Sequence, residues 1–129
     1  MKKLFIGLLA VVLLSYFSFR SLLRPGYFPM HDDMQIIRLV QMDKCVKDGQ
    51  IPCRWVPDLG YGYGYPLYLY YGPFTYYVME AFHLTGFSFI DSVKAEIVLT
   101  IILSGIGMFL LGKSLWGFGG GLVSAVFYI

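Results

Sequence analysis

The segment "LFIGLLAVVLLSYFSF", residues Leu4 to Phe19, decides the fold class because it contains no charged side chain. An α-helix that rises about 1.5 Å per residue needs about 20 apolar residues to cross about 30 Å of hydrocarbon. Leu22 and Leu23 extend the apolar character beyond Arg20. We therefore expect a first transmembrane helix over residues 1–23.

A cleaved signal peptide is the alternative interpretation of this segment, since Lys2 and Lys3 provide a short basic start. Signal peptides end at a cleavage site with small residues, whereas bulky aromatic residues precede Arg20. The sequence therefore favours an uncleaved membrane anchor.

The composition of the whole chain is also that of a membrane protein. Its 129 residues are 57% hydrophobic and 14% charged, and the mean hydropathy is +0.65. Soluble domains contain about 25% charged residues. The net charge of +2 gives no electrostatic basis for nucleic-acid binding. We expect an all-α, polytopic transmembrane protein in the plasma (inner) membrane.

The remaining segments follow from changes between apolar and polar character. Proline and glycine end the first helix, and the capping pattern at Ser88–Asp91 begins a later one. The last apolar segment is too short to cross a bilayer, so we expect an N-terminal fragment that is truncated in its fourth span. After the first helix we expect a long first extracytoplasmic loop domain (24–65) that contains a short helix (32–48). A re-entrant segment and a second transmembrane helix follow (66–90). The chain then forms a third transmembrane helix (91–112) and the start of a fourth (116–129).

Tyrosines gather in the segment "LGYGYGYPLYLYYGPFTYY", Leu59 to Tyr77, which contains eight of the eleven tyrosines of the chain. A tyrosine has an apolar ring and a polar tip, so such a cluster is typical of the aromatic belt at a membrane interface. The alternative is an aromatic platform for a sugar ring or an isoprenoid chain. Composition alone favours the belt.

Four ionisable residues admit a structural interpretation beside a functional one. Asp32 and Asp33 precede a predicted helix that has Gln35 near its start, which is a good N-cap pattern. Glu80 and His83 lie three residues apart in an apolar segment, where ionisable groups are costly and often functional. The simpler interpretation, that they satisfy each other on one helical face or lie near the membrane interface, is favoured.

Several short motifs, taken in order, resemble the N-terminal part of the GT-C-class polytopic membrane glycosyltransferases. More narrowly, the chain is similar to bacterial membrane proteins labelled as related to 6-pyruvoyl-tetrahydropterin synthase. The resemblance covers nearly the whole chain but only the start of the family's usual length. Asp33 departs from the family pattern, in which the residue after the His-Asp pair is often small. The residues that carry the resemblance are His31-Asp32-Asp33, Asp48 to Pro52, Arg54-Trp55, Pro57, Gly60 to Pro66, Tyr71 to Pro73 and Tyr76-Tyr77.

This resemblance implies an inverting glycosyltransferase that takes its sugar from a polyprenyl-phosphate lipid. It places the catalytic carboxylate at Asp32, with Asp33 second. A carboxylate within about 3 Å of an acceptor hydroxyl can act as general base. With His31, the two aspartates could instead hold a divalent cation. The further candidates for substrate binding are Arg38, Arg54, Trp55, Tyr61, Tyr63 and Tyr65.

The two arginines and the two cysteines each leave an alternative open. The guanidinium groups of Arg38 and Arg54 suit a donor phosphate, but ion pairs with aspartates of the same loop suit them equally well. Those aspartates are Asp43, Asp48 and Asp58. Cys45 and Cys53 can form a disulfide if the loop is extracytoplasmic, and are otherwise two buried small residues.

Two indications of membrane orientation conflict. The resemblance places the loop outside and the N-terminus in the cytoplasm, whereas the excess of lysine and arginine in the loop favours the opposite. We follow the resemblance. The main alternative to an enzyme is a non-catalytic multi-pass membrane module. A transporter is disfavoured because the charges concentrate in the loop and not in the spans.

Overall fold

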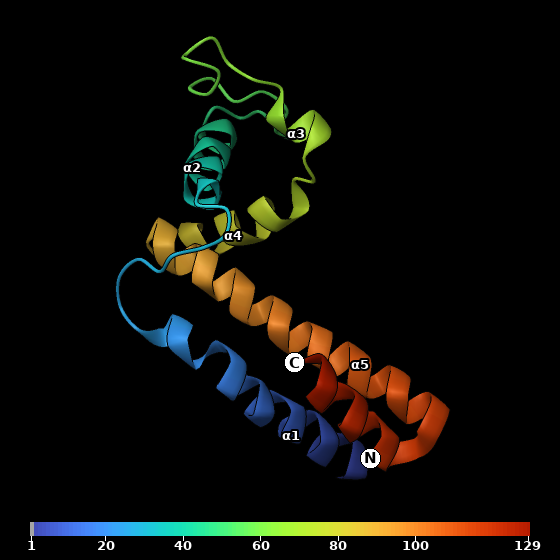
Figure 1. The fold of residues 1–129 in the computed structure, drawn as a ribbon. Helices are drawn as coiled ribbons and strands as arrows, with labels where there is room; N and C mark the ends of the chain where they lie inside the picture. Colours follow the sequence, from blue (N-terminus) through green and yellow to red (C-terminus); the bar gives the residue numbers. More distant parts are fainter. Residues whose placement is uncertain (1) are drawn as a thin grey trace. The chain divides into compact units, whose positions relative to one another are not determined.

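A computed structural model describes residues 2–129, and these residues form helices joined by loops (Figure 1). The predicted all-helical class is confirmed, since the described part of the chain has no strand beyond one isolated bridge between Val56 and Tyr65. The elements are α1 (Lys2–Phe19), the 3₁₀ helix η1 (Arg20–Leu23), α2 (Met34–Lys47), α3 (Leu67–Tyr70), α4 (Phe74–Leu84) and α5 (Phe89–Tyr128).

The chain divides into two compact units. The first, which we call the apolar unit, contains residues 2–25 and Ile97–Ile129. The second, the polar domain, contains Gly26–Glu96. Helix α5 begins in the polar domain and continues into the apolar unit.

The apolar unit contains one candidate membrane-spanning helix of the described chain and most of the other. Lys2–Leu23 and Phe89–Tyr128 are long and apolar enough to cross a membrane. Their large apolar side chains lie mainly on the surface: Phe17 is 65% exposed and Phe127 is 89% exposed. A soluble protein would bury such a surface, whereas a lipid environment accommodates it.

Helix α5 reverses direction at Gly117, whose backbone has φ 74° and ψ −170°. A residue with a side chain rarely adopts this conformation, so glycine permits the turn. The chain after Gly117 returns against the preceding helix, and a Cβ at Gly112 would lie 2.5 Å from Ser124 Oγ. The structure therefore extends the predicted third helix (91–112) to Trp116 and forms a short returning helix where the start of a fourth span (116–129) was predicted.

Small residues allow the helices of the apolar unit to pack closely. A Cβ at Gly7 of α1 would lie 2.2 Å from the ring of Phe109, and a Cβ at Gly105 would lie 3.1 Å from Val11. Val11, Phe109 and Ala125 form the buried core of this unit. Close approach of backbones through small residues is the usual mode of helix packing in membranes.

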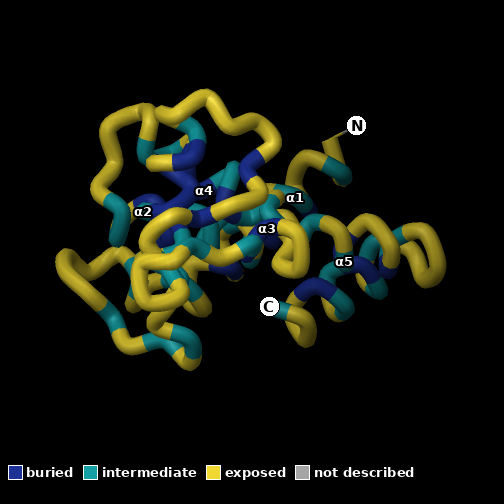
Figure 2. Tube along the Cα trace, turned by 90° about the horizontal axis from the view of Figure 1, so that it is seen from above, coloured by how far each residue is buried: buried dark blue, intermediate teal, exposed yellow. Residues whose placement is uncertain are grey.

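In the polar domain α2 packs against α4, and buried residues concentrate along these two helices (Figure 2). The interior is unusual because it contains charged and amide groups beside apolar ones. The buried residues of α2 and α4 are Leu39, Gln41, Met42, Asp43, Cys45, Tyr76, Met79 and Glu80.

The predicted re-entrant segment and second transmembrane helix (66–90) agree with the structure in the break at Gly72 and Pro73 but differ from it in the length of the second helix. This region divides into α3 and the 11-residue α4, which at about 1.5 Å per residue is about half the length that a span requires. Gly72 and Pro73 separate the two helices, and Gly86, with φ 103°, follows the end of α4. The residues after α4 form the predicted capping pattern, in which Ser88 Oγ accepts the Asp91 N–H at 3.1 Å.

Candidate functional site

The candidate site is built around Asp32, at the beginning of α2. Asp32 Oδ1 accepts the backbone N–H of Met34 at 3.1 Å, which satisfies a free donor of the first helical turn. Asp32 Oδ2 accepts from Gln35 Nε2 at 3.3 Å and forms an ion pair with Arg38 at 2.6 Å. Asp32 therefore binds a backbone N–H of the first turn, whereas Asp33, which occupies the N-cap position of α2, makes no capping bond with its side chain. The side chain of Asp32 remains 34% exposed.

Arg38 connects this carboxylate to α4. Its Nη1 donates to Tyr76 Oη at 3.5 Å, and Tyr76 in turn donates to Gln35 Oε1 at 2.6 Å. The guanidinium carbon lies 4.5 Å from the centre of the Tyr71 ring, in a cation–π arrangement. The side chain of Arg38 is only 15% exposed, so these contacts hold the guanidinium against Asp32.

These contacts determine the charge state of Asp32. The hydrogen bond from the Met34 N–H and then the bond and charge of Arg38 lower the pKa of Asp32 below its usual value. The charge of His31 acts in the same direction. The carboxylate is thus ionised at neutral pH and accessible on one side.

Asp33 does not join Asp32. It accepts the Tyr27 hydroxyl in a short hydrogen bond and the Met30 N–H at 3.3 Å, which turns it toward the preceding loop. Residues 2–129 contain no group of three or more histidine, cysteine, aspartate or glutamate side chains placed to hold a metal ion. The alternative of a divalent cation held by His31, Asp32 and Asp33 therefore finds no preformed site in the described chain.

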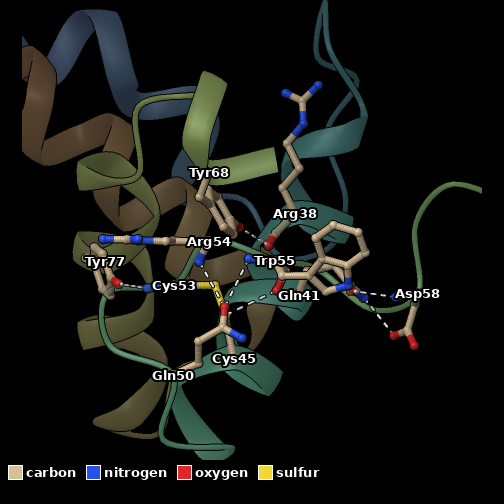
Figure 3. The surroundings of a disulfide bond; sticks show 10 residues. All are labelled: Arg38, Gln41, Cys45, Gln50, Cys53, Arg54, Trp55, Asp58, Tyr68 and Tyr77. Atoms are coloured by element: carbon tan, nitrogen blue, oxygen red, sulfur yellow. Dashed lines mark hydrogen bonds between the residues drawn. A yellow bond between two sulfur atoms is a disulfide. The ribbon is translucent and has the colours of Figure 1, made fainter. Parts of the chain in front are cut away.

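A disulfide joins Cys45 of α2 to Cys53 in the following loop, which decides between the two interpretations of these cysteines (Figure 3). The side chain of Gln50 lies inside this loop, where its Oε1 accepts the N–H groups of Arg54 at 2.9 Å and Trp55 at 3.0 Å. The Cys53 N–H donates to Tyr77 Oη of α4 at 2.6 Å. The loop is therefore anchored to both helices.

The structure does not place the guanidinium groups of Arg38 and Arg54 together. Figure 3 shows the Arg38 group pointing away from the disulfide and the Arg54 group extending on the side of Tyr77. Two of the aspartates considered as ion-pair partners of the arginines pair with lysines instead. Arg38 pairs with Asp32, whereas Lys47 pairs with Asp43 and Lys44 pairs with Asp58.

The tyrosine-rich segment separates into an exposed and a buried group. Tyr61 and Tyr63 are 103% and 87% exposed at the tip of a loop in which Gly60, Gly62 and Gly64 have positive φ. Tyr61 itself has φ 59°, which is uncommon for a residue with a side chain. Tyr65, 44% exposed, lies at the base of the loop.

The base of this loop also positions Trp55. Val56 and Tyr65 exchange two backbone hydrogen bonds of 2.9 Å. A Cβ at Gly64 would lie 2.3 Å from Trp55 Nε1, so the indole rests directly on the glycine backbone. Trp55, Tyr61, Tyr63 and Tyr65 thus form one partly exposed aromatic group, which we call the aromatic loop.

Four side chains that the sequence analysis did not select complete the site. Tyr68 donates to the carbonyl oxygen of Arg38 at 2.6 Å, and its burial raises its pKa. Tyr71, Tyr76 and Gln35 surround Arg38 as described above. Gln35 was detectable, because it lies one helical turn from Asp32 and Arg38. The tyrosines come from a distant segment and gave no local signal.

Glu80 and His83 do not satisfy each other, contrary to the sequence-based expectation. His83 Nδ1 lies 2.8 Å from the carbonyl oxygen of Phe87, and its ring stacks on Phe89 with centroids 3.9 Å apart. Neither carboxylate oxygen of Glu80 has a hydrogen-bond partner in the described chain.

Comparison with protein families, with curated proteins and with solved structures finds no match to this chain.

Proposed function

We propose that this protein is an integral membrane glycosyltransferase that transfers a sugar from a polyprenyl-phosphate lipid. In this proposal Asp32 is the carboxylate that orients the acceptor hydroxyl and accepts its proton. The observation that carries this proposal is the state of Asp32. It is ionised, 34% exposed and fixed in direction by Arg38 and by the start of α2.

The chemistry requires one carboxylate on the acceptor side. The acceptor hydroxyl oxygen forms a bond to the anomeric carbon while the bond from that carbon to the lipid phosphate breaks. The electron pair leaves with the phosphate, and the hydroxyl proton passes to the carboxylate. Because its pKa is lowered, Asp32 is a weak base, so its main role is to orient the hydroxyl and to accept its proton as the phosphate departs.

Other residues have supporting roles in this proposal. Arg38 is a positioning residue, since its guanidinium is mostly buried against Asp32 and Tyr76. Exposed Arg54 is the candidate for the donor phosphate, because a guanidinium pairs well with phosphate oxygens. The aromatic loop offers ring faces on which a sugar can stack.

The disulfide supports an extracytoplasmic position for the polar domain. Disulfides persist in oxidising compartments and are rare in the cytosol. The bond between Cys45 and Cys53 therefore favours the orientation with a cytoplasmic N-terminus, in the plasma membrane.

A non-catalytic membrane module is the second candidate function, and one observation favours it. Both oxygens of Asp32 already accept hydrogen bonds, from Met34, Gln35 and Arg38. A purely structural role as N-cap and ion-pair partner accounts for all of these contacts.

The test compares the native protein with Asp32→Asn in membranes, using radiolabelled polyprenyl-phosphate hexose as donor and extracted lipid and glycan fractions as acceptors. Asn preserves the shape and capping ability of the residue but removes its charge. Asp58→Asn is the matched control, because Asp58 is also an ion-paired carboxylate of the polar domain.

Three results have different meanings. If transfer is lost in Asp32→Asn and retained in Asp58→Asn, with both variants folded, the enzyme proposal stands. If both variants transfer as well as the native protein, Asp32 is only structural. If the native protein transfers no sugar, the glycosyltransferase proposal is contradicted and the membrane module is favoured.

A further inference from the structure

A second polar cluster lies between α2 and α4, away from the proposed reaction. Three buried side-chain oxygens of the described chain have no hydrogen-bond donor: Asp43 Oδ1, Glu80 Oε1 and Glu80 Oε2. Glu80 is only 2% exposed and Asp43 only 5%. Buried polar atoms are nearly always hydrogen-bonded, so three unsatisfied atoms in one cluster require an explanation.

The neighbouring charged groups do not supply these donors. Lys47 pairs with the other oxygen of Asp43 at 2.8 Å, and its side chain is 62% exposed. His83 Nε2 lies 3.9 Å from Asp43 Oδ1, which is beyond hydrogen-bond distance. At the start of α5, Asp91 and Lys94 pair with each other at 3.9 Å.

The position of the His83 proton follows from its contact with Phe87. A carbonyl oxygen can only accept, so His83 Nδ1 carries a hydrogen and donates it to the Phe87 carbonyl. Lys47 pairs with the other oxygen of Asp43, and neither Lys47 nor His83 donates a hydrogen bond to Glu80.

An ionised Glu80 would be very costly here. A buried carboxylate without donors loses its hydration and gains nothing in return. It would also face the charge of Asp43. Burial, followed by the charge of Asp43, raises the pKa of Glu80 above its usual value, and the charges of His83 and Lys47 oppose this shift without reversing it.

We propose that Glu80 is protonated at neutral pH and donates its O–H to Asp43 Oδ1, so that a carboxylic acid and a carboxylate join α4 to α2 through one bound proton. This single proton satisfies two of the three unsatisfied oxygens. It leaves Glu80 uncharged beside Asp43, whose other oxygen keeps its ion pair with Lys47.

The polar domain is thereby a proton-binding unit whose stability decreases as the pH rises. In the folded state Glu80 binds its proton more tightly than in the unfolded chain. Its contribution is complete below the ordinary glutamate pKa of 4.5 and is lost as the pH rises through the higher folded value. Between these two values, one proton makes the unfolding equilibrium constant increase up to about tenfold per pH unit.

The first experiment measures unfolding of the whole protein in detergent micelles as a function of pH. Trp55 lies in the polar domain and Trp116 in the apolar unit, so a Trp116→Phe background makes fluorescence report on the polar domain alone. In this background the native cluster is compared with Glu80→Gln. Glu96→Gln is the matched control, because Glu96 is the only other glutamate of the chain.

We expect Glu80→Gln to remove the loss of stability with rising pH, because an amide stays neutral and can still donate to Asp43. Glu96→Gln should keep the loss of stability with rising pH, because it leaves the proton of Glu80 in place. An unfolding constant that depends on pH equally in all three proteins would overturn the proposal.

The second experiment needs no variant at this position and applies even if Glu80→Gln does not fold. Infrared spectra are recorded at neutral pH on protein with and without ¹³C-carboxyl glutamate. A protonated acid carbonyl band that shifts with the label, and that persists in Glu96→Gln, supports the proton on Glu80. Absence of a label-sensitive acid band at neutral pH would contradict it.

Discussion

The apolar unit and the polar domain have similar numbers of residues but are held together in opposite ways. In the apolar unit Gly7 packs against Phe109, Gly105 against Val11 and Gly112 against Ser124, and the large apolar side chains face outward. In the polar domain the interior contains ionisable and amide groups, and a disulfide joins a helix to its loop.

This difference follows from the surroundings that each unit requires. Lipid chains are as apolar as leucine, so helices in a membrane gain stability from close contact and not from burial of apolar surface. A domain in water can bury polar groups only when their hydrogen bonds are made. Mutations should therefore act through steric fit in the apolar unit and through hydrogen bonds, charge and cross-linking in the polar domain.

Removal of the disulfide should have the largest effect on the polar domain. For two cysteines eight residues apart, the loss of the cross-link should cost about 2.5 kcal/mol in the chain-entropy description. The measurement is urea unfolding of the Cys45→Ala, Cys53→Ala double variant, followed by Trp55 fluorescence in the Trp116→Phe background. An equal loss of stability in the apolar unit would show that the two units do not unfold separately.

Substitution of Gly7 should have the largest effect on the apolar unit. A methyl group at this position would lie 2.2 Å from the Phe109 ring, so Gly7→Ala should destabilise the unit by about 2 kcal/mol. Gly107→Ala is the control, because a Cβ there meets no atom within 4 Å. Unfolding in mixed micelles, followed by Trp116 fluorescence in a Trp55→Phe background, measures both. Equal stability of the two variants would contradict the close contact.

Loss of one hydroxyl should have a moderate effect on the polar domain. Tyr76→Phe removes the bonds to Gln35 and Arg38 and should cost about 1 kcal/mol. Tyr71→Phe is the matched control, since in the described chain the Tyr71 hydroxyl makes no hydrogen bond and its ring keeps the contact with Arg38. Thermal unfolding measures the stability of both variants. Equal stability of Tyr76→Phe and Tyr71→Phe would contradict the hydrogen bonds of the Tyr76 hydroxyl.

The pH dependence of Asp32 should give the smallest effect, and its direction is opposite to that of Glu80. The pKa of Asp32 is lowered in the folded state, so its contribution is present above the ordinary value of 3.8 and is lost as the pH falls through the folded value. Asp32→Asn should therefore weaken the acid sensitivity of unfolding, measured by circular dichroism. Unchanged acid sensitivity would mean that the Met34 N–H and Arg38 do not stabilise this carboxylate.

Local patterns in the sequence predicted much of the fold. The uncharged run from Leu4 to Phe19 predicted the first candidate span, and the residues before Met34 predicted the start of α2. The Ser88–Asp91 pattern predicted the beginning of α5 to within two residues. These features depend on neighbours along one helix, so a short segment contains all the information they need.

The second apolar segment shows where local patterns are insufficient. Its composition suits a span, but α4 ends after 11 residues and buries Tyr76 and Glu80 against α2. The aromatic side chains of a membrane belt and those of a domain core have the same composition. Only the packing partner distinguishes them, and that partner is about 40 residues distant in the sequence.

The sequence by itself determined the helical class, the candidate spans, the aspartate pair at the start of α2 and the cysteine pair available for a disulfide, because each depends on spacing or composition within a short segment. The tertiary structure decided which charged and polar side chains lie next to one another. It paired Arg38 with Asp32, turned Asp33 away toward Tyr27, and enclosed Glu80 beside Asp43. Electrostatic interactions in a folded chain depend on distance and burial, and these quantities exist only after helices from distant segments have packed together.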